Sequence, residues 1–420
     1  MTRQAHSGLL RKLLGPAMMR IAGTVVSFLI VLLLAKGSET DGLAAYHLLT
    51  TLAGFWLIAS KFGLDTISLR LAARQESAVA KILVIRDSLR AACLPIAVLL
   101  PVLVIYLAVF EPMTGADLLT VALIAISLVA FTFLVIAIEF YRASERQSIH
   151  SCIRFFLPNL AILALIYASM TVLPSGWSHW LIAYSPVIGR LMIAVLGGAI
   201  IGYIFLRHSR TARAKGEIHA KPEKMLWDYV PVGIATTLVV ALGFIAVKSI
   251  AVFGGETDVA AHAVIIRITY GLTVLTSTVS SLVSPRMSRF NEDKEALWSL
   301  FRFSSRLMLL VGGLFMALII LFGSWFLGIF NSVFTQYYPE LIVFSLAAVV
   351  NGIPFGQFMV QLDLEKPFVR IMIVAVVLQL LGCAIFGTVW GMLGIGIVAV
   401  FVAGFWNLSC FITIKKYGKL

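Results

Sequence analysis

Charged side chains are scarce in this sequence. Asp, Glu, Lys and Arg make up only 13% of its 420 residues, whereas 60% of the residues are hydrophobic. A typical soluble domain carries about 25% charged residues. The chain therefore has too little polar surface to fold as a globule in water, and we expect a lipid bilayer to be its solvent.

The motifs of nucleotide-binding and catalytic sites are also missing from the sequence. It contains no Gly-x-x-x-x-Gly-Lys-Ser/Thr loop, no metal-ligand spacing and no paired nucleophile and base in a polar segment. The four cysteines lie within hydrophobic segments or at their expected cytoplasmic ends, where disulfides are not expected. We therefore expect no enzyme activity, no metal and no other cofactor.

Long hydrophobic runs are abundant. A helix needs roughly 20 apolar residues to cross a bilayer, because each backbone polar group must be paired inside the segment. Twelve such runs lie near residues 13–35, 43–69, 88–110, 117–141, 152–173, 177–206, 227–253, 258–284, 301–329, 337–361, 367–389 and 392–414. They predict an all-α polytopic membrane protein with twelve transmembrane helices.

A five-residue motif in the first half of the chain recurs, with one substitution, in the second half. Residues 37–41 read GSETD and residues 254–258 read GGETD. Such residues are also favoured at helix starts, so the motif alone has two explanations. Shorter echoes follow downstream at nearly the same offset, in residues 44–46 with 260–262 and in residues 68–70 with 284–286. Together they indicate an internal duplication.

The duplication predicts the domain organisation. Six spans per half is an even number, so both halves enter the membrane in the same direction. We expect two six-helix bundles, residues 1–206 and 226–420, related by a pseudo-twofold along the membrane normal and joined by a basic linker, residues 207–225. Transporters with such parallel repeats bind substrate between their halves and alternate between two facing states.

The basic residues orient the expected spans. With the N-terminus in the cytoplasm, nearly all Lys and Arg outside the spans fall on that side, and the other side carries Lys36 with several acids. This distribution follows the positive-inside rule, so we expect both termini in the cytoplasm of a multi-pass bacterial inner membrane protein. The net charge of +13 is then explained by the membrane, and no nucleic-acid partner is expected.

Several short segments carry a family resemblance: residues 33–37 (LLAKG), 41–46 (DGLAAY), 62–65 (FGLD), 70–74 (RLAAR), 284–290 (SPRMSRF) and 390–394 (WGMLG). They resemble segments of polysaccharide flippases of the multidrug/oligosaccharidyl-lipid/polysaccharide exporter superfamily. Each motif is short, and their order and spacing over twelve spans carry the resemblance. Twelve helices resemble the O-antigen and exopolysaccharide flippases more than the lipid II flippases, which have two more.

The resemblance implies a function. Such flippases move a polyprenyl-pyrophosphate-linked oligosaccharide from the cytoplasmic to the periplasmic leaflet by alternating access, with polysaccharide polymerase and chain-length proteins as candidate partners. A multidrug or cation antiporter of the same superfamily is the main alternative, and it would need a buried acid to attract its cationic substrates. A lipid II flippase and a polytopic polysaccharide polymerase are further alternatives, although the expected outer loops are too short for a catalytic domain.

Four cations inside the expected spans suit a diphosphate headgroup. Arg190 and Arg267 lie near mid-depth, Arg20 lies inside the first span, and Lys248 lies toward the outer end of the seventh. Charges at such depth usually face a polar interior, and the arginine fork matches phosphate. Arg20 and Lys248 are also close enough to the membrane surface to extend to it, so a headgroup role and an interfacial role both stay open for them.

Acids at the edges of the spans are candidates for coupling transport to protons or sodium. They are Asp65, Glu139 and Asp363, all toward the expected cytoplasmic side, where ordinary solvation is the simpler expectation. Lys61 stands one turn from Asp65, which predicts an internal ion pair. Related flippases often carry an acid where this chain has Lys61, so headgroup binding is kept open for it as well.

The expected topology can be tested by cysteine labelling or reporter fusions. Six positions in the expected outer loops should all be reached from the periplasm: Glu39, Glu111, Ser175, Glu256, Tyr338 and Gly391. Labelling of two or more of them from the cytoplasm alone would show that the number of spans is wrong.

Overall fold

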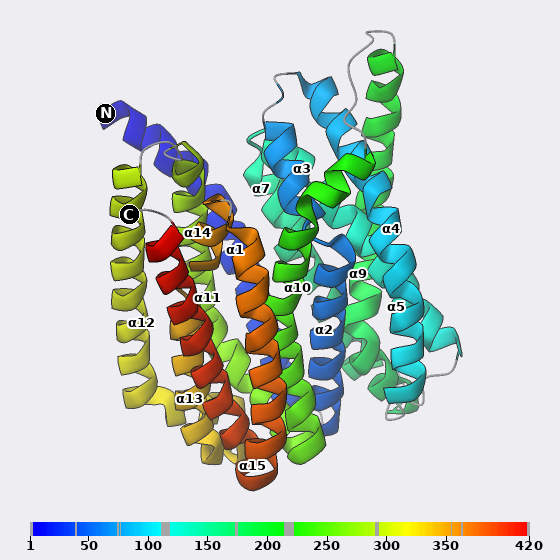
Figure 1. Ribbon diagram of the computed structural model, residues 1–420. Coiled ribbons are helices and arrows are strands. Elements are labelled where there is room, and N and C mark those ends of the chain that lie inside the picture. Colours follow the sequence, from blue (N-terminus) through cyan, green and yellow to red (C-terminus); the bar gives the residue numbers. More distant parts are fainter. Residues whose placement is uncertain are drawn as a thin grey trace. The chain divides into compact units, whose positions relative to one another are not determined.

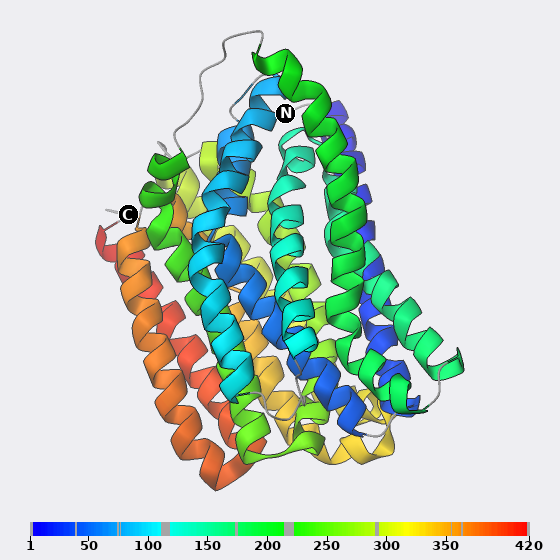
Figure 2. The same cartoon turned by 90° about the vertical axis from the view of Figure 1, so that its right-hand side faces the viewer.

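The computed structural model describes residues 3–37, 40–73, 75, 77–110, 118–172, 175–213, 222–289, 294–353, 355–362 and 364–417. Every regular element in these ranges is helical (Figure 1, Figure 2).

The first half of the chain contains α1 (Arg3–Gly37), α2 (Thr40–Lys61), α3 (Leu64–Ala73), α4 (Ala78–Phe110), α5 (Leu118–Ala137), α6 (Glu139–Ala143), α7 (Gln147–Ser151), the π-helix η2 (Cys152–Phe156), α8 (Leu157–Val172) and α9 (Ser175–Arg213). The second half contains α10 (Pro222–Phe253), α11 (Glu256–Arg289), α12 (Lys294–Phe330), the 3-10 helix η3 (Ser332–Tyr337), α13 (Tyr338–Asn351), α14 (Phe355–Gln361) and α15 (Glu365–Tyr417).

The helices account for the expected spans. Ten segments in the described part of the chain are long and apolar enough to cross a membrane. One of them, α15, covers both expected spans 367–389 and 392–414. The expected span 258–284 lies in α11, whose 34 residues extend about 50 Å at the α-helical rise, more than a bilayer requires. The prediction of an all-helical polytopic protein is therefore confirmed.

Three expected spans are wrong in one respect, because each is broken. The span 43–69 divides between α2 and α3, the span 117–141 between α5 and α6, and the span 337–361 between α13 and α14. At the first break Phe62 and Gly63 have φ angles of 47° and 75°, left-handed values that end an α-helix. Hydropathy did not reveal these breaks, because apolar residues continue on both sides of each.

Close backbone packing accompanies the break after α2. A Cβ atom on Gly233 of α10 would lie 2.7 Å from the carbonyl oxygen of Phe62, and one on Gly63 would lie 3.3 Å from the backbone nitrogen of Gly233. Gly233 therefore lets α10 approach the turn more closely than any side chain would allow, and Gly63 supplies the positive φ angle that the turn requires. The contact fixes where Lys61, the last residue of α2, is placed.

Backbone contacts divide the chain into two compact units. Unit 1 consists of Met1–Ser27 and Leu49–Thr237, and unit 2 consists of Phe28–Leu48 and Leu238–Leu420. The helices α1, α2 and α10 are therefore each divided, with one part in unit 1 and the other part in unit 2. The expected bundles, residues 1–206 and 226–420, rest on the repeat alone, which carries no sign of this exchange. Of the expected linker, residues 214–221 lie outside the described part of the chain.

Specific contacts attach residues 28–48, named the docking segment from here on, to the rest of unit 2. The rings of Phe28 and Phe330 meet edge to face with centroids 4.8 Å apart. Asn331 donates a hydrogen bond of 3.3 Å from its side chain to the carbonyl oxygen of Ala35. On α2, His47 contacts His262 of α11. The docking segment is therefore held at both of its helices.

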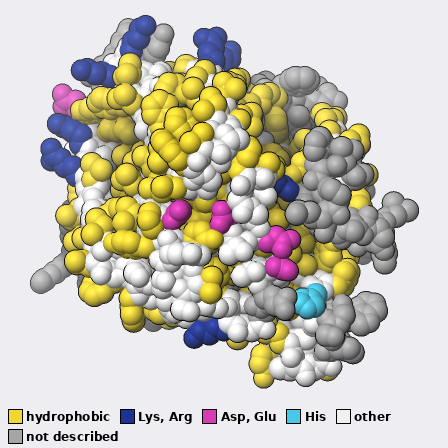
Figure 3. Space-filling view, turned by 90° about the horizontal axis from the view of Figure 1, so that it is seen from below, with side chains coloured by type: hydrophobic (Ala, Val, Ile, Leu, Met, Phe, Trp, Pro, Cys, Tyr) yellow, Lys and Arg dark blue, Asp and Glu magenta, His cyan; other side chains and the backbone are white. Residues whose placement is uncertain are grey.

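The helix starts of unit 2 carry acids. Asp41 begins α2, Glu256 and Asp258 begin α11, and Glu340 begins α13. Acidic side chains are seen on the face of the molecule viewed from below, within a surface that is mostly hydrophobic or uncharged (Figure 3). Negative side chains at helix starts are favourable, because they face the positive end of the helix dipole.

A single glycine folds α15 back on itself. Gly391 has φ 56° and ψ −136° inside this helix, and a Cβ atom there would meet nothing within 4 Å. A Gly391→Ala substitution should therefore destabilise the protein by about 1–2 kcal/mol through backbone strain alone. Gly404→Ala is the matched control, since its site is also open and lies in ordinary helix. Thermal unfolding in detergent measures both, and equal unfolding temperatures would contradict the prediction.

Candidate functional site

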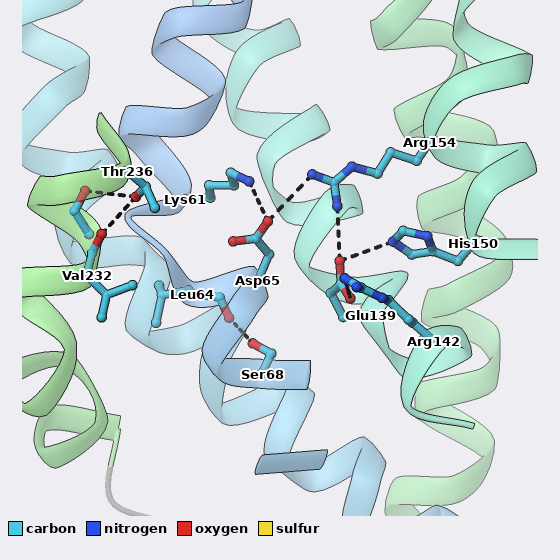
Figure 4. Close-up of polar contacts among 11 residues, drawn as sticks. Lys61, Leu64, Asp65, Ser68, Glu139, Arg142, His150, Arg154, Val232 and Thr236 are labelled. Atoms are coloured by element: carbon cyan, nitrogen blue, oxygen red, sulfur yellow. Dashed lines mark hydrogen bonds and ion pairs between the residues drawn. The ribbon is translucent and has the colours of Figure 1, made fainter. Parts of the chain in front are cut away.

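Charged residues of unit 1 come together where its helices are interrupted (Figure 4). Lys61 ends α2, and Asp65 lies in the first turn of α3. Glu139 begins α6, directly after the break that ends α5. Arg154 lies in the π-helix η2. Interrupted helices thus bring charges from four elements into one place.

Two buried carboxylates organise the contacts. Asp65 accepts an ion-paired hydrogen bond from Lys61, and its Oδ2 lies 3.6 Å from Nη2 of Arg154. Glu139 Oε1 lies 3.1 Å from both Arg154 Nη1 and His150 Nε2. Arg142 approaches the other oxygen of Glu139 to 3.7 Å. Arg154 therefore bridges the two acids.

Burial makes these pairings necessary. Only 7% of Asp65, 1% of Glu139 and 8% of Lys61 are exposed. An ionised group taken out of water costs several kcal/mol unless it is paired, so each of these charges depends on its partners. Removing one member would leave its partners with fewer compensating contacts.

The π-helix places Arg154 and connects the site to α1. Asn159 donates two hydrogen bonds of 3.0 Å, to the carbonyl oxygens of Phe155 and of Gly23 on α1. A Cβ atom on Gly23 would lie 2.6 Å from the oxygen of Phe155, so only glycine permits this contact. The Phe155 ring lies 5.5 Å from the guanidinium carbons of both Arg20 and Arg154. One aromatic ring therefore lies beside two cations.

Arg20 is the cation without a matching acid. Its Nε is buried and has no hydrogen-bond partner among the described residues. It lies close enough to Arg142 and Arg154 to be repelled by both. We define the charged cluster as Arg20, Lys61, Asp65, Glu139, Arg142, His150 and Arg154. With a neutral histidine it contains four cations and two anions, an arrangement suited to binding an anion.

The sequence predicts part of this cluster. The ion pair between Lys61 and Asp65 is present. The expectation that Asp65 and Glu139 are solvated at loop edges is wrong, because both are buried in ion pairs. Asp363 lies outside the described residues.

The other predicted cations lie elsewhere in the chain. Arg190 lies on α9 in unit 1, with a buried Nη1. Lys248 on α10 and Arg267 on α11 belong to unit 2. Arg267 lies over the ring of Tyr270 at 5.8 Å. The expected set of cations is therefore divided between the two units.

Three members of the cluster escaped the sequence reasoning. In the sequence analysis, Arg142 is one of the basic residues expected outside the spans on the cytoplasmic side, and His150 and Arg154 are not candidates for the site. A signal exists, since Arg154 lies inside the expected span 152–173 and is joined to Glu139 by a short connection. Two adjacent antiparallel spans with opposite charges near their connected ends indicate an ion pair.

Comparison with solved structures shows which fold this is. The chain is similar to MATE in complex with MaD3S, with 18% identity, a TM-score of 0.67 and 97% of each chain covered. It is similar to a mutant of the Vibrio cholerae MATE transporter VcmN, with 14% identity, a TM-score of 0.65 and 99% of each chain covered.

Two further structures match about equally. One is an inward-facing and the other an outward-facing conformation of a multidrug resistance MATE family transporter of the MOP superfamily, each 16% identical, with TM-scores of 0.65 and 0.66. The matches cover 96% and 97% of this chain, and 99% and 96% of those chains. No family model and no curated protein matches the sequence. The chain has the helical membrane fold of MATE transporters, which confirms the predicted fold class.

A double-mutant cycle tests the buried ion pair. Glu139→Gln and Arg154→Met should each destabilise the protein by about 1.5–3 kcal/mol, since each removes a charge-assisted hydrogen bond from a group whose other partners remain. The double variant should lose less than the sum of the two, because the partners disappear together. Arg146→Met is the control, as Arg146 is an exposed residue of the same unit and its loss should matter little. Strictly additive losses in thermal unfolding would refute the pairing.

Proposed function

We propose that this protein is a membrane transporter that moves an anionic, lipid-linked substrate across the bilayer by alternating access. The observation that carries the proposal is the excess of positive charge around Arg20, whose Nε is buried and has no hydrogen-bond partner among the described residues. Cations brought together partly out of water repel one another, and a bound anion would supply the missing counter-charge. The fold supports transport, since solved structures with it include inward-facing and outward-facing conformations of MATE family transporters.

The substrate class that fits this charge is a polyprenyl-pyrophosphate-linked oligosaccharide. Its diphosphate is strongly anionic, and arginine recognises phosphate through two parallel hydrogen bonds. Its hydrocarbon tail can stay in the bilayer, because exposing it to water would cost about 0.8 kcal/mol per CH₂ group. Only the headgroup therefore has to pass through the protein.

The other cations predicted from the sequence belong to the same proposal. Arg190, Arg267 and Lys248 lie on long helices and are candidates to contact the headgroup at other stages of transport. Lys61 is already paired with Asp65, so its first role is to keep that acid charged. Surface polysaccharide biosynthesis at the bacterial inner membrane, with a polymerase and chain-length proteins as partners, is the proposed context.

A multidrug or cation antiporter is the second candidate. The observation that favours it is the name of one similar protein, a multidrug resistance MATE family transporter. Attraction of cationic drugs requires an acid that is available to them. In unit 1 the buried acids Asp65 and Glu139 are instead occupied by cations of the chain itself. The charge balance therefore favours the anionic substrate.

Binding of the headgroup can be measured directly. The purified protein in nanodiscs should bind a polyprenyl diphosphate, and Arg20→Ala should weaken binding about tenfold or more, since it removes charge-assisted hydrogen bonds to phosphate. Arg20→Lys should restore part of the affinity by restoring charge without the fork. In cells, Arg20→Ala should also reduce surface polysaccharide at unchanged protein level.

The matched control is Arg146→Ala, which removes an exposed arginine from the same unit. The same nanodiscs are tested with lipophilic cations. Tight binding of such cations together with no binding of the diphosphate would reject the lipid-linked substrate and support the drug antiporter.

A further inference from the structure

A pair of buried histidines joins the docking segment to the rest of unit 2. His47 Nε2 on α2 and His262 Nδ1 on α11 are 2.9 Å apart, within hydrogen-bond distance. The rings are 5% and 3% exposed, respectively, and their centroids are 5.2 Å apart. Phe344 of α13 closes one side, with its ring 4.8 Å from that of His262. Water is thus largely excluded from this contact.

The geometry limits how many protons the pair can hold. A hydrogen bond between two ring nitrogens contains one hydrogen, so one nitrogen donates and the other must accept. The docked rings can therefore carry three N–H groups in total, whereas two separated rings can carry four. A second excess proton would place two N–H groups, and two positive charges, against each other.

The surroundings also disfavour positive charge on the pair. Arg267, on the same helix as His262, is close enough to repel a charge on His47. Among the residues whose side chains are described, the other charged groups on these elements of unit 2 are Lys36 on α1, Asp41 on α2, Lys248 on α10, Glu256 and Asp258 on α11, and Glu340 on α13. Asp41 and Glu256 bond to each other at the exposed helix starts, and that hydrogen bond, together with the charge of Asp41, raises the pKa of Glu256.

The acids Asp41 and Glu256 attract each other more at low pH than at high pH, so they cannot release the docking segment when protons are added. Because Asp41 raises the pKa of Glu256, Glu256 takes up a proton at low pH, which relieves its repulsion with Asp41, and it loses that proton as the pH rises. Lowering the pH therefore strengthens this contact of the docking segment. Any release of the segment at low pH must come from another group.

We propose that His47 and His262 form a proton-binding site that couples proton uptake to release of the docking segment. Separation of the rings frees both nitrogens to take protons from water, and renewed docking returns the second excess proton to the solvent. The released state binds more protons than the docked state. By thermodynamic linkage, lowering the pH therefore shifts the equilibrium toward the released state. Because α1 and α2 continue from the docking segment into unit 1, release would bear on the alternating access proposed above.

The test places two spin labels across the docking contact. Lys36→Cys on α1 and Ser332→Cys in η3 replace exposed residues, each next to a partner of the hydrogen bond between Ala35 and Asn331. The full-length protein, with its four native cysteines replaced by alanine, is labelled in nanodiscs. Dipolar broadening of the spectrum is followed between pH 8 and pH 5. We expect most of the broadening to be lost at pH 5.

Substitutions assign that loss to the histidines. The double variant His47→Gln/His262→Asn places amide groups where Nε2 and Nδ1 stood and does not titrate, so broadening should persist at both pH values. His47→Gln alone should behave alike, because one charged ring can still donate to an amide; it serves if the double variant does not fold. The control His179→Gln removes an exposed histidine of α9 and should keep the pH response.

Three results would overturn the proposal: broadening in the unsubstituted pair that does not change with pH, a pH response that survives in His47→Gln/His262→Asn, or a response to sodium at constant pH. The measurement needs no transported substrate. A failure of the lipid-linked substrate therefore leaves this result intact, and a failure here leaves the headgroup-binding result intact.

Discussion

A charge at membrane depth must have a counter-charge, and this constraint explains the construction of unit 1. Glu139 is 1% exposed and faces three basic groups, and Arg154 connects it to Asp65. A continuous α-helix would present each of these residues only to its own neighbours. The break after α2, the break before α6 and the π-helix η2 each place one charged residue against the others. The irregular backbone of this unit thus follows from its electrostatics.

Hydropathy predicts the spans because a bilayer forces every crossing segment to pair its own backbone. The ion pair of Lys61 and Asp65 is predictable because the two residues are one turn apart in sequence. The contacts of Arg154 depend on a π-helix and on a glycine contact with α1, and neither has a strong sequence signal. The contact between His47 and His262 is not predictable from the internal repeat, although the two residues are 215 positions apart. The repeat aligns Tyr46, rather than His47, with His262, and an alignment of two residues does not indicate that they touch.

The fold indicates how the helices are arranged, whereas the charge distribution bears on the substrate. The likeness to MATE transporters, at 14–18% identity, describes how the helices are arranged and says nothing about what passes through the protein. The balance of cations and acids around Arg20 depends on the side chains rather than on the arrangement of the helices, and it is the feature on which the proposed anionic cargo rests. The docking segment adds a third element, a contact in unit 2 made by residues from the first half of the chain.

The π-helix has a consequence for how such a site arises and is lost. A π-turn is equivalent to one residue inserted into an α-helix, and it rotates everything on one side of it by about 100° relative to the other. A one-residue deletion within Cys152–Phe156 would restore a regular helix while changing no charged side chain. It would nevertheless turn Arg154 away from Glu139 or shift Asn159 from its contacts with α1. Related sequences with the same charged residues can therefore differ in whether this cluster exists, and an insertion or deletion at this position is more informative than a substitution.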